Sequence, residues 1–445
     1  MKRSTLKNSL GLRLIIIAFL SLVLLIPAQM IKSLIRERQE RREEAVKEVF
    51  NKWGSKQIIG GPILTIPFKS TMRTNEREIF EVKKYVHLLP EDLNITGIVT
   101  PQRRYRGIYE MVLYQAKLQI NGHFNSSEIK NLSIPINKLY LEEASLSLGI
   151  SDMKGIKEMA DVKWNSDILY SSPGIQARGI LPVGVSVKTP IDLNREDYRF
   201  DIAINLNGSE DLMFTPVGKE NIVKISSPWN NPSFSGEYLP DFRQINEDGF
   251  KAEWKILYMN RNYPQKWIGD EFRIEPSKFG VTFLIPVDEY QKTMRTAKYV
   301  LMFITFTFFT FFLIELLNRR AIHPIQYLLI GFALLLFYTL LLSLSEHFRF
   351  NFAYLISSLS IIVMISTYTK AVLKSNWQVL LIFGFLSILY SYLFLILQLQ
   401  DYALLMGSIV LFFILGLLMF ITRGIDWFLI FKPQNTEKLS EPNSG

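Results

Sequence analysis

The sequence predicts a membrane protein with an α-helical part and a β-rich part. We expect an α-helical transmembrane bundle of about six spans and a large β-rich, sandwich-like extracytoplasmic domain inserted between the first and second spans. Nearly all long apolar runs lie before residue 32 or after residue 298, which predicts the spans. The stretch between these runs alternates apolar and polar residues, which predicts the β-rich domain. Basic residues gather in alternate short loops, which predicts the orientation.

The first span is expected at residues 10–31. A helix needs roughly 20 apolar residues to cross a hydrocarbon core about 30 Å thick, and this run supplies them. Arg13 lies near its start and Pro27 near its end. No small-x-small cleavage site follows the run, so we expect an uncleaved anchor rather than a signal peptide.

A bundle of five further helices is expected at residues 298–421. Its spans are predicted at 299–317, 325–345, 352–373, 377–397 and 402–421. Placing residues 1–9 and the tail 422–445 in the cytoplasm gives the cytoplasmic loops most of the Lys and Arg, and leaves Arg349 to the opposite loops. The basic flank at 32–42 opposes this orientation, but the summed short loops favour it.

Residues 32–58 are predicted to form a helical stalk. Glu37/Arg41 and Glu43/Lys47 have the i,i+4 spacing of helix-surface ion pairs. A solvated helix face with surface ion pairs explains these residues equally well. Gly60-Gly61-Pro62 must end any helix.

The domain at residues 59–297 has the period-two pattern of half-buried antiparallel strands. The alternation is clearest at 112–120, 198–206 and 252–258, and further strands are expected at 62–68, 79–89, 146–150, 221–226 and 279–287. Asn121-Gly122, Asn207-Gly208 and Asp248-Gly249 are turn signals. Helices should be scarce here, and a sandwich-like architecture of one or two subdomains follows.

Composition excludes several functions. The chain has no cysteine, which excludes disulfides, thiol catalysis and cysteine-ligated metals. Its net charge of +9 is explained by membrane orientation, and no nucleic-acid-binding motif accompanies it, so no nucleic-acid partner is expected. The sequence contains no His-Glu-x-x-His motif of metalloproteases, no Gly-x-Ser-x-Gly motif of hydrolases, no P-loop, and no Gly-x-Gly-x-x-Gly dinucleotide motif after a strand. We therefore predict no catalytic, cofactor-binding or metal-binding residue, no cofactor, and no enzymatic activity.

His87 and His123 lie on separate predicted strands. Either is a conceivable metal ligand, but with no cysteine and no close acidic partner we favour structural roles.

Four ionisable residues at membrane ends are candidate functional groups: Glu315, His323, Glu346 and His347. A proton or ion relay is one interpretation, because charge in a membrane is costly and often retained for function. The other interpretation places them at interface depth, hydrogen-bonded and fixing helix ends. The second is favoured because none lies at the bilayer midplane.

Several segments together resemble the CreD family of bacterial inner-membrane proteins. They are IGGPILTIP at 59–67, NPSFSGEYLP at 231–240, the stretch 298–315, HPIQYLLIG at 323–331, LSEH at 344–347 and TRGIDW at 422–427. The resemblance covers nearly the whole chain. This chain departs from the family pattern at Lys154. Its residues 151–156 read Ser-Asp-Met-Lys-Gly-Ile, where relatives resemble Ser-Asp-x-Arg-Gly-Ile. Lysine keeps the charge there but lacks the planar fork for a bidentate salt bridge.

The resemblance implies a six-span protein of the inner membrane with its large domain in the periplasm. It also implies a role in cell-envelope integrity under stress, within a CreBC-type two-component regulon that affects tolerance to colicins and β-lactams. No enzymatic activity is implied. The expected partners are the lipid bilayer and an unknown envelope component or protein. Two alternatives stay open: a transporter or channel for small molecules or lipids, and a membrane enzyme acting on envelope precursors.

Overall fold

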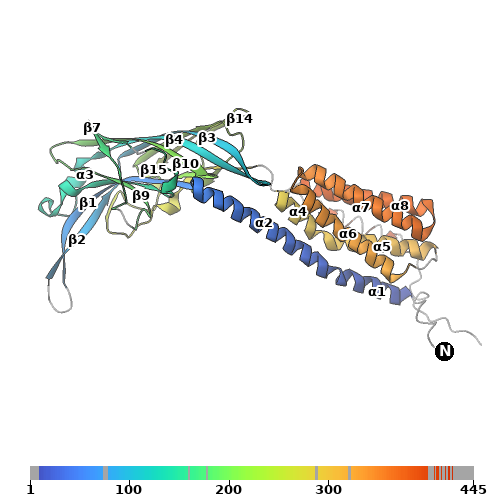
Figure 1. Cartoon of the computed structure of the whole chain (residues 1–445). Coiled ribbons are helices and arrows are strands. Elements are labelled where there is room, and N and C mark those ends of the chain that lie inside the picture. The colour runs from blue at the N-terminus through green and yellow to red at the C-terminus, as the bar shows by residue number, and fades with distance from the viewer. Residues whose placement is uncertain are drawn as a thin grey trace, which may run out of the picture. The chain divides into compact units, whose positions relative to one another are not determined.

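The computed structural model describes residues 10–73, 79–158, 161–176, 179–285, 289–318 and 322–398, together with single positions between 405 and 423. The chain divides into two compact units. A β-rich unit comprises Arg42–Pro286, and a helical unit comprises Met1–Arg41 with Val287–Gly445. Figure 1 shows the strands of the first and the helices of the second.

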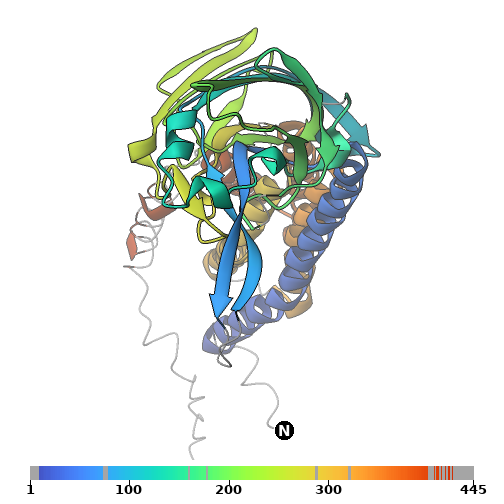
Figure 2. The ribbon, with the colours of Figure 1, turned by 90° about the vertical axis from the view of Figure 1, so that its left-hand side faces the viewer.

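The β-rich unit contains two sheets. A nine-stranded sheet has the order β13-β17-β11-β1-β5-β9-β8, with β2 paired to β1 and β16 to β2. Its strands are β1 Gln57–Arg73, β2 Ile79–Leu88, β5 Ser145–Ile150, β8 Ser172–Pro173, β9 Gly184–Lys188, β11 Asp211–Phe214, β13 Pro232–Gly236, β16 Lys266–Ile268 and β17 Phe279–Phe283. The β1–β2 hairpin projects from the rest of the domain, as Figures 1 and 2 both show.

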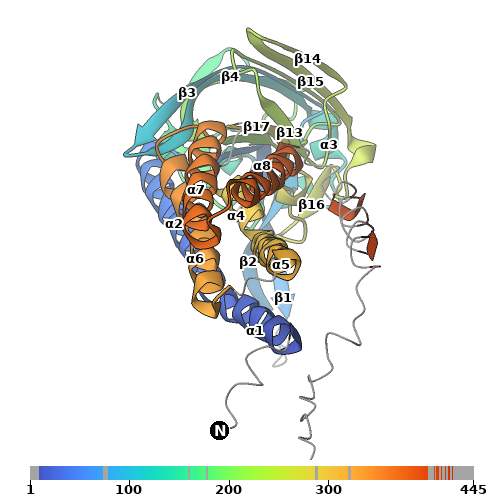
Figure 3. The ribbon, with the colours of Figure 1, turned by 90° about the vertical axis from the view of Figure 1, so that its right-hand side faces the viewer.

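The eight-stranded sheet has the order β14-β15-β12-β3-β4-β10-β6-β7. Its strands are β3 Asp92–Arg106, β4 Tyr109–Asn125, β6 Asp161–Trp164, β7 Asp167–Tyr170, β10 Asp197–Ser209, β12 Glu220–Ser227, β14 Phe242–Asn246 and β15 Gly249–Leu257. Pairing is antiparallel except for β12 with β3 in this sheet and β1 with β11 in the other. In Figure 3, β3, β4, β14 and β15 arch over β13 and β17.

One apolar core joins the two sheets, so the β-rich part of the prediction holds. Ile66 of β1 and Leu148 of β5 belong to the same buried cluster as Ile120 of β4 and Trp254 of β15. The predicted alternation is visible in β12, whose residues are buried at every second position. Such alternation places one sheet face in the core and leaves the other to solvent.

Two of the three predicted turns are wrong. Asn121-Gly122 lies inside β4 and Asn207-Gly208 inside β10, and these two strands pair with each other. Asp248-Gly249 does join a hairpin, between β14 and β15.

Close packing explains why Gly122 and Gly208 lie within strands and do not form the predicted turns. A Cβ at Gly122 would clash with the backbone oxygen of Asp92, and a Cβ at Gly208 would clash with the ring of Tyr114. Glycine is therefore required at both positions for close approach within a strand rather than for a turn.

Helices are scarce in this unit among the described residues, as predicted. Besides the end of α2 (Leu25–Trp53), the described residues of this unit contain one short α-helix, α3 at Ser126–Lys130, and 3₁₀ turns of three residues each. At Lys154, the residue that departs from the family pattern, Nζ donates to the backbone carbonyl of Asn51 at 3.3 Å. A cation near a helix C-terminus is favourable, and lysine meets this need without a planar fork.

The helices are α1 Leu10–Val23, α2 Leu25–Trp53, α4 Glu289–Lys298, α5 Val300–Asn318, α6 Pro324–Ser345, α7 Phe350–Leu373 and α8 Asn376–Gln398. Of the residues predicted as a helical stalk, 32–53 form the later part of α2. The helix ends at Trp53, and the last two residues of the predicted stalk, 57 and 58, already belong to β1. Helices α6, α7 and α8 lie where the sequence predicts spans.

Among the described residues, four helices are long and apolar enough to cross a membrane: Gly11–Trp53, α6, α7 and α8. Helices α4 and α5 together give a fifth, bent by 45°. Most of the span predicted at 402–421 lies outside the described residues. Figure 3 shows α6, α7 and α8 grouped together, and α6 packs on α7, which packs on α8.

Candidate functional site

Glu315 is buried and paired with a residue from the other end of the chain. It lies near the C-terminal end of α5 with 3% of its surface exposed. The guanidinium Nη1 of Arg13, in α1, contacts its Oε1. The hydroxyl of Tyr327, in α6, donates to its Oε2 at 3.1 Å. The carboxylate is thus compensated by one cation and one hydroxyl donor, as a buried charge requires.

His323 caps the N-terminus of helix α6. Its Nδ1 accepts the backbone N–H of Ile325 at 3.2 Å, and its own backbone N–H donates to Oε1 of Gln326 at 2.9 Å. This reciprocal arrangement is a capping box, and Pro324 occupies the first helical position. The side chain therefore satisfies a backbone N–H at the N-terminus of α6 that has no partner within the helix.

Glu346 caps the other end of α6. Its Oε1 accepts the hydroxyl hydrogen of Tyr290 at 3.1 Å and lies 4.0 Å from Nε of Arg38 in α2. Its side chain is 11% exposed and that of Arg38 is 41% exposed. The adjacent His347 is exposed, and its backbone N–H donates to the carbonyl of Leu344 at 3.1 Å.

The four candidates do not converge on one site. His323 and Glu346 lie at opposite ends of α6, about 35 Å apart at 1.5 Å per residue. Glu315 shares its environment with Tyr327 near the first end, and Glu346 with Arg38 near the second. The geometry therefore gives two separate charged clusters. Each is attached by one arginine to the first helix, meaning the N-terminal helix Gly11–Trp53 that comprises α1 and α2.

Sequence reasoning missed both arginine partners. In the sequence, Arg13 stands only as a charge within the first apolar run, and Arg38 only as part of the basic flank that opposes the predicted orientation. Arg13 was the available signal, because a charge inside a span requires a partner. Its partner Glu315 lies 302 residues away, and no local pattern could identify it.

A polar hollow of about 500 Å³ lies in the β-rich unit. It is lined by residues of β3, β4, β6 and β10 and the adjacent loop: Asp92, Asn121, Gly122, His123, Lys163, Asn165, Asp197, Arg199, Phe200 and Asp201. Acidic and basic groups are both present. The lining therefore offers donors and acceptors of both charges to a polar ligand.

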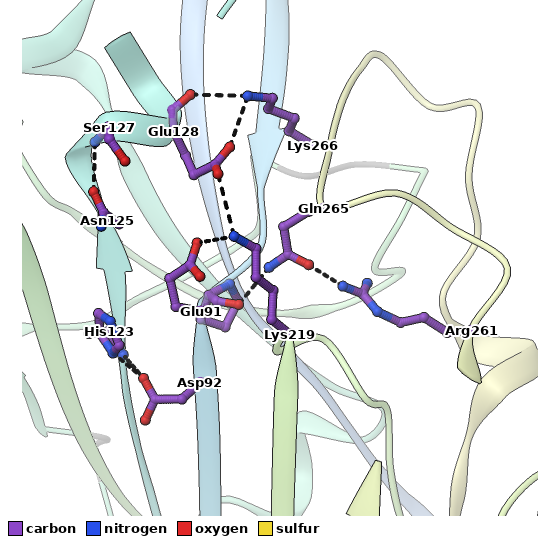
Figure 4. Close-up of polar contacts among 11 residues, drawn as sticks. Glu91, Asp92, His123, Asn125, Ser127, Glu128, Lys219, Arg261, Gln265 and Lys266 are labelled. Carbon is purple, nitrogen blue, oxygen red and sulfur yellow. Dashed lines mark hydrogen bonds and ion pairs between the residues drawn. The ribbon is translucent and has the colours of Figure 1, made fainter. Parts of the chain in front are cut away.

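His123 has a close acidic partner, so the expectation that it has none is wrong. Its Nδ1 contacts Oδ1 of Asp92, and its backbone N–H donates to the same oxygen at 3.2 Å. Figure 4 shows the two side chains facing each other. Asp92 and His123 are opposite one another in the β3–β4 register, and strand pairing of this kind is set by the tertiary fold. Among the described residues no three His, Asp or Glu groups are arranged to hold a metal ion.

His87 is a core residue. It is 1% exposed, its Nδ1 lies 3.0 Å from Oγ1 of Thr65, and its ring lies beside Trp267. Burial lowers the pKa of His87 to about 4, so the ring is neutral at physiological pH. This is the structural role that the sequence favours for it.

A salt-bridge network lies near the Asp92–His123 pair (Figure 4). Nζ of Lys219 lies 2.7 Å from Glu91 and 3.4 Å from Glu128, and Nζ of Lys266 lies 2.9 Å from Glu128. The hydrogen bond from Lys266 holds the pKa of Glu128 below its ordinary value. The network joins α3 to β16 and to the loop before β12, and so stabilises this end of the domain.

Comparison with known proteins gives a consistent match. The family model described as Inner membrane protein CreD matches residues 9–428. The Inner membrane protein CreD of Escherichia coli strain K12 is 32% identical over 421 residues, which covers 93% of this chain and 92% of that protein. A solved M1 zinc metallopeptidase from Deinococcus radiodurans aligns with a TM-score of 0.19 at 9% identity, over 38% of this chain and 39% of that chain. A score that low carries no argument.

Proposed function

We propose, since the chain belongs to the CreD family of inner membrane proteins, that it is a non-enzymatic protein that maintains cell-envelope integrity under stress. Its regulation by a CreBC-type two-component system, with effects on tolerance to colicins and β-lactams, is part of this proposal. The protein is a multi-pass inner-membrane protein with a β-rich domain. The proposal assigns that domain to the periplasm, where it binds an envelope component.

The proposed topology places residues 1–9 and 422–445 in the cytoplasm and the domain at 59–297 in the periplasm. Lys and Arg in the short loops support it. The basic flank at 32–42 is the opposing feature. Its acidic neighbours, such as Glu37 at 2.7 Å from Arg41, count little in this rule, so the orientation rests on the summed short loops.

The polar hollow supports the proposed binding of an envelope component by the β-rich domain. Its volume of about 500 Å³ is in the range of small-molecule sites. Lys163 and Arg199 provide cationic donors there, while Asp197 and Asp201 provide anionic acceptors. Such a lining suits a polar, hydrogen-bonding segment of an envelope polymer or protein.

Single-cysteine variants test both topology and binding. The chain contains no cysteine, so Arg199→Cys introduces a unique thiol in the hollow. Lys69→Cys, at a half-exposed position of β1 in the other sheet, is the matched control. In intact cells, a membrane-impermeant maleimide should label both variants. A thiol-directed photocrosslinker should give an adduct with an envelope component only at residue 199.

Maleimide labelling tests the periplasmic location of the domain, and photocrosslinking tests ligand binding in the hollow. Labelling that occurs only after cell lysis would place the domain in the cytoplasm and overturn the periplasmic role. Equal labelling without any adduct at residue 199 would remove the hollow as a binding site. Arg199→Glu should also reduce colicin and β-lactam tolerance in cells that depend on this protein, while Lys69→Glu should leave tolerance unchanged.

A further inference from the structure

An apolar groove of about 550 Å³ lies within the helical unit. It is lined by Pro27 and Ile31 of α2, by α6 between Leu329 and Thr339, and by α7 between Met364 and Tyr368. Every lining residue is apolar except Thr339 and Tyr368. Water gains few hydrogen bonds in such a groove, whereas a lipid acyl chain fills it with dispersion contacts.

The groove is aligned with the charged cluster at the end of α6. Arg38 follows Pro27 by about three helical turns on α2, and Glu346 follows Leu335 by about three turns on α6. Both charged residues therefore lie on the same helix faces as groove residues. The distance from Ile31 to Arg38 along α2 and from Thr339 to Glu346 along α6 is about 10 Å in each case.

This distance suits a single phospholipid molecule. One leaflet contributes about 15 Å to the hydrocarbon core, so a chain that starts at the charged pair enters the groove within its own leaflet. We propose that the groove holds an acyl chain of a phosphatidylethanolamine molecule whose headgroup lies at Arg38 and Glu346.

The headgroup assignment rests on the charges of this pair. Nε of Arg38 and Oε1 of Glu346 are 4.0 Å apart, beyond hydrogen-bonding distance, and the arginine side chain is 41% exposed. The guanidinium is a strong phosphate donor, and the carboxylate accepts hydrogen bonds from a primary ammonium. Phosphatidylethanolamine carries both groups. Phosphatidylglycerol has no ammonium, and the quaternary ammonium of phosphatidylcholine has no N–H to donate.

Lipid retention by the intact protein tests the headgroup site. The full chain is mixed with equimolar phosphatidylethanolamine, phosphatidylglycerol and phosphatidylcholine of identical chains, and bound lipid is measured by native mass spectrometry. Wild type should retain phosphatidylethanolamine preferentially. Arg38→Gln and Glu346→Gln should each lower that retention about tenfold, as the loss of one charge-assisted hydrogen bond predicts.

Arg36→Gln is the matched control. Arg36 follows Pro27 by about two and a half turns, which places it on the opposite face of α2, and it is exposed. The same charge change there should leave lipid retention unchanged. Equal retention in the Arg38→Gln and Arg36→Gln variants would overturn the proposal, as would wild-type retention of all three lipids alike.

A second variant tests the groove without changing charge. Ala333→Trp places a large ring in the groove and should lower retention of phosphatidylethanolamine severalfold. Leu355→Trp, at an exposed position of α7 outside the groove, should not. Unchanged lipid retention in Ala333→Trp would exclude the groove as the binding site of the acyl chain. The thermal unfolding of each variant shows that folded proteins are being compared.

Discussion

The first helix is attached to the bundle at two points by similar groups in different surroundings. At each point an arginine of the first helix meets a glutamate of the bundle, and a tyrosine hydroxyl donates to that glutamate. The residues are Arg13, Glu315 and Tyr327 at one point, and Arg38, Glu346 and Tyr290 at the other.

The two attachments differ in burial and distance. The carboxylate of Glu315 is 2% exposed and in direct contact with Arg13, whereas Glu346 is 11% exposed and 4.0 Å from Arg38. A buried pair is costly to break, because removing one partner leaves a charge without compensation. A pair whose cation is partly exposed and 4.0 Å from the carboxylate contributes less, because water reaches the guanidinium. The first attachment is therefore the stronger structural contact, while the second leaves the guanidinium of Arg38 partly open to solvent.

The largest expected effect is that of Arg13→Gln. Leaving Glu315 buried without its cation should lower the free energy of unfolding by about 3–5 kcal/mol. Unfolding in mixed micelles with increasing dodecyl sulfate measures it. The double variant Arg13→Gln/Glu315→Gln should recover much of the loss, because no buried charge remains. A double variant as unstable as the single one would show that packing, rather than charge, holds this end.

An intermediate effect is expected at the N-terminus of α6. His323→Ala removes the acceptor for the Ile325 N–H and should cost about 1 kcal/mol, while His323→Asn restores a capping side chain and should cost less. The same unfolding assay measures both. His347→Ala removes an exposed imidazole and should change stability by less than about 0.5 kcal/mol. Equal effects at the two histidines would contradict the capping role.

Arg38→Gln, at the other attachment, should have a much smaller effect on stability than Arg13→Gln. Its long, partly exposed contact with Glu346 should contribute no more than about 1 kcal/mol to the free energy of unfolding, and added salt should reduce the difference from wild type. Arg36→Gln is again the control. A loss comparable to that of Arg13→Gln would mean that the two attachments are equivalent.

The predicted strands succeeded where one face is buried. In β12, Val223 and Ile225 are buried and Lys224 is exposed, because a strand on a sheet face alternates between core and solvent. The predicted turns at Gly122 and Gly208 failed because local sequence cannot distinguish a turn glycine from one that admits a close neighbour.

The candidate site was predictable only in part. Local sequence identified Glu315, His323, Glu346 and His347 as ionisable groups beside apolar runs. It did not identify their partners, nor the placement of Asp92 beside His123, because each contact joins residues of different strands or helices.

The sequence alone determined where apolar helices form and where alternating strands form. The helices follow from apolar runs of about 20 residues, and the strands follow from period-two alternation. Only the tertiary structure decided which arginine meets which glutamate, that two sheets share one core, and that three helices leave a groove between them. Those features depend on contacts between residues far apart in the chain, whose pairing follows from the packing of whole helices and sheets.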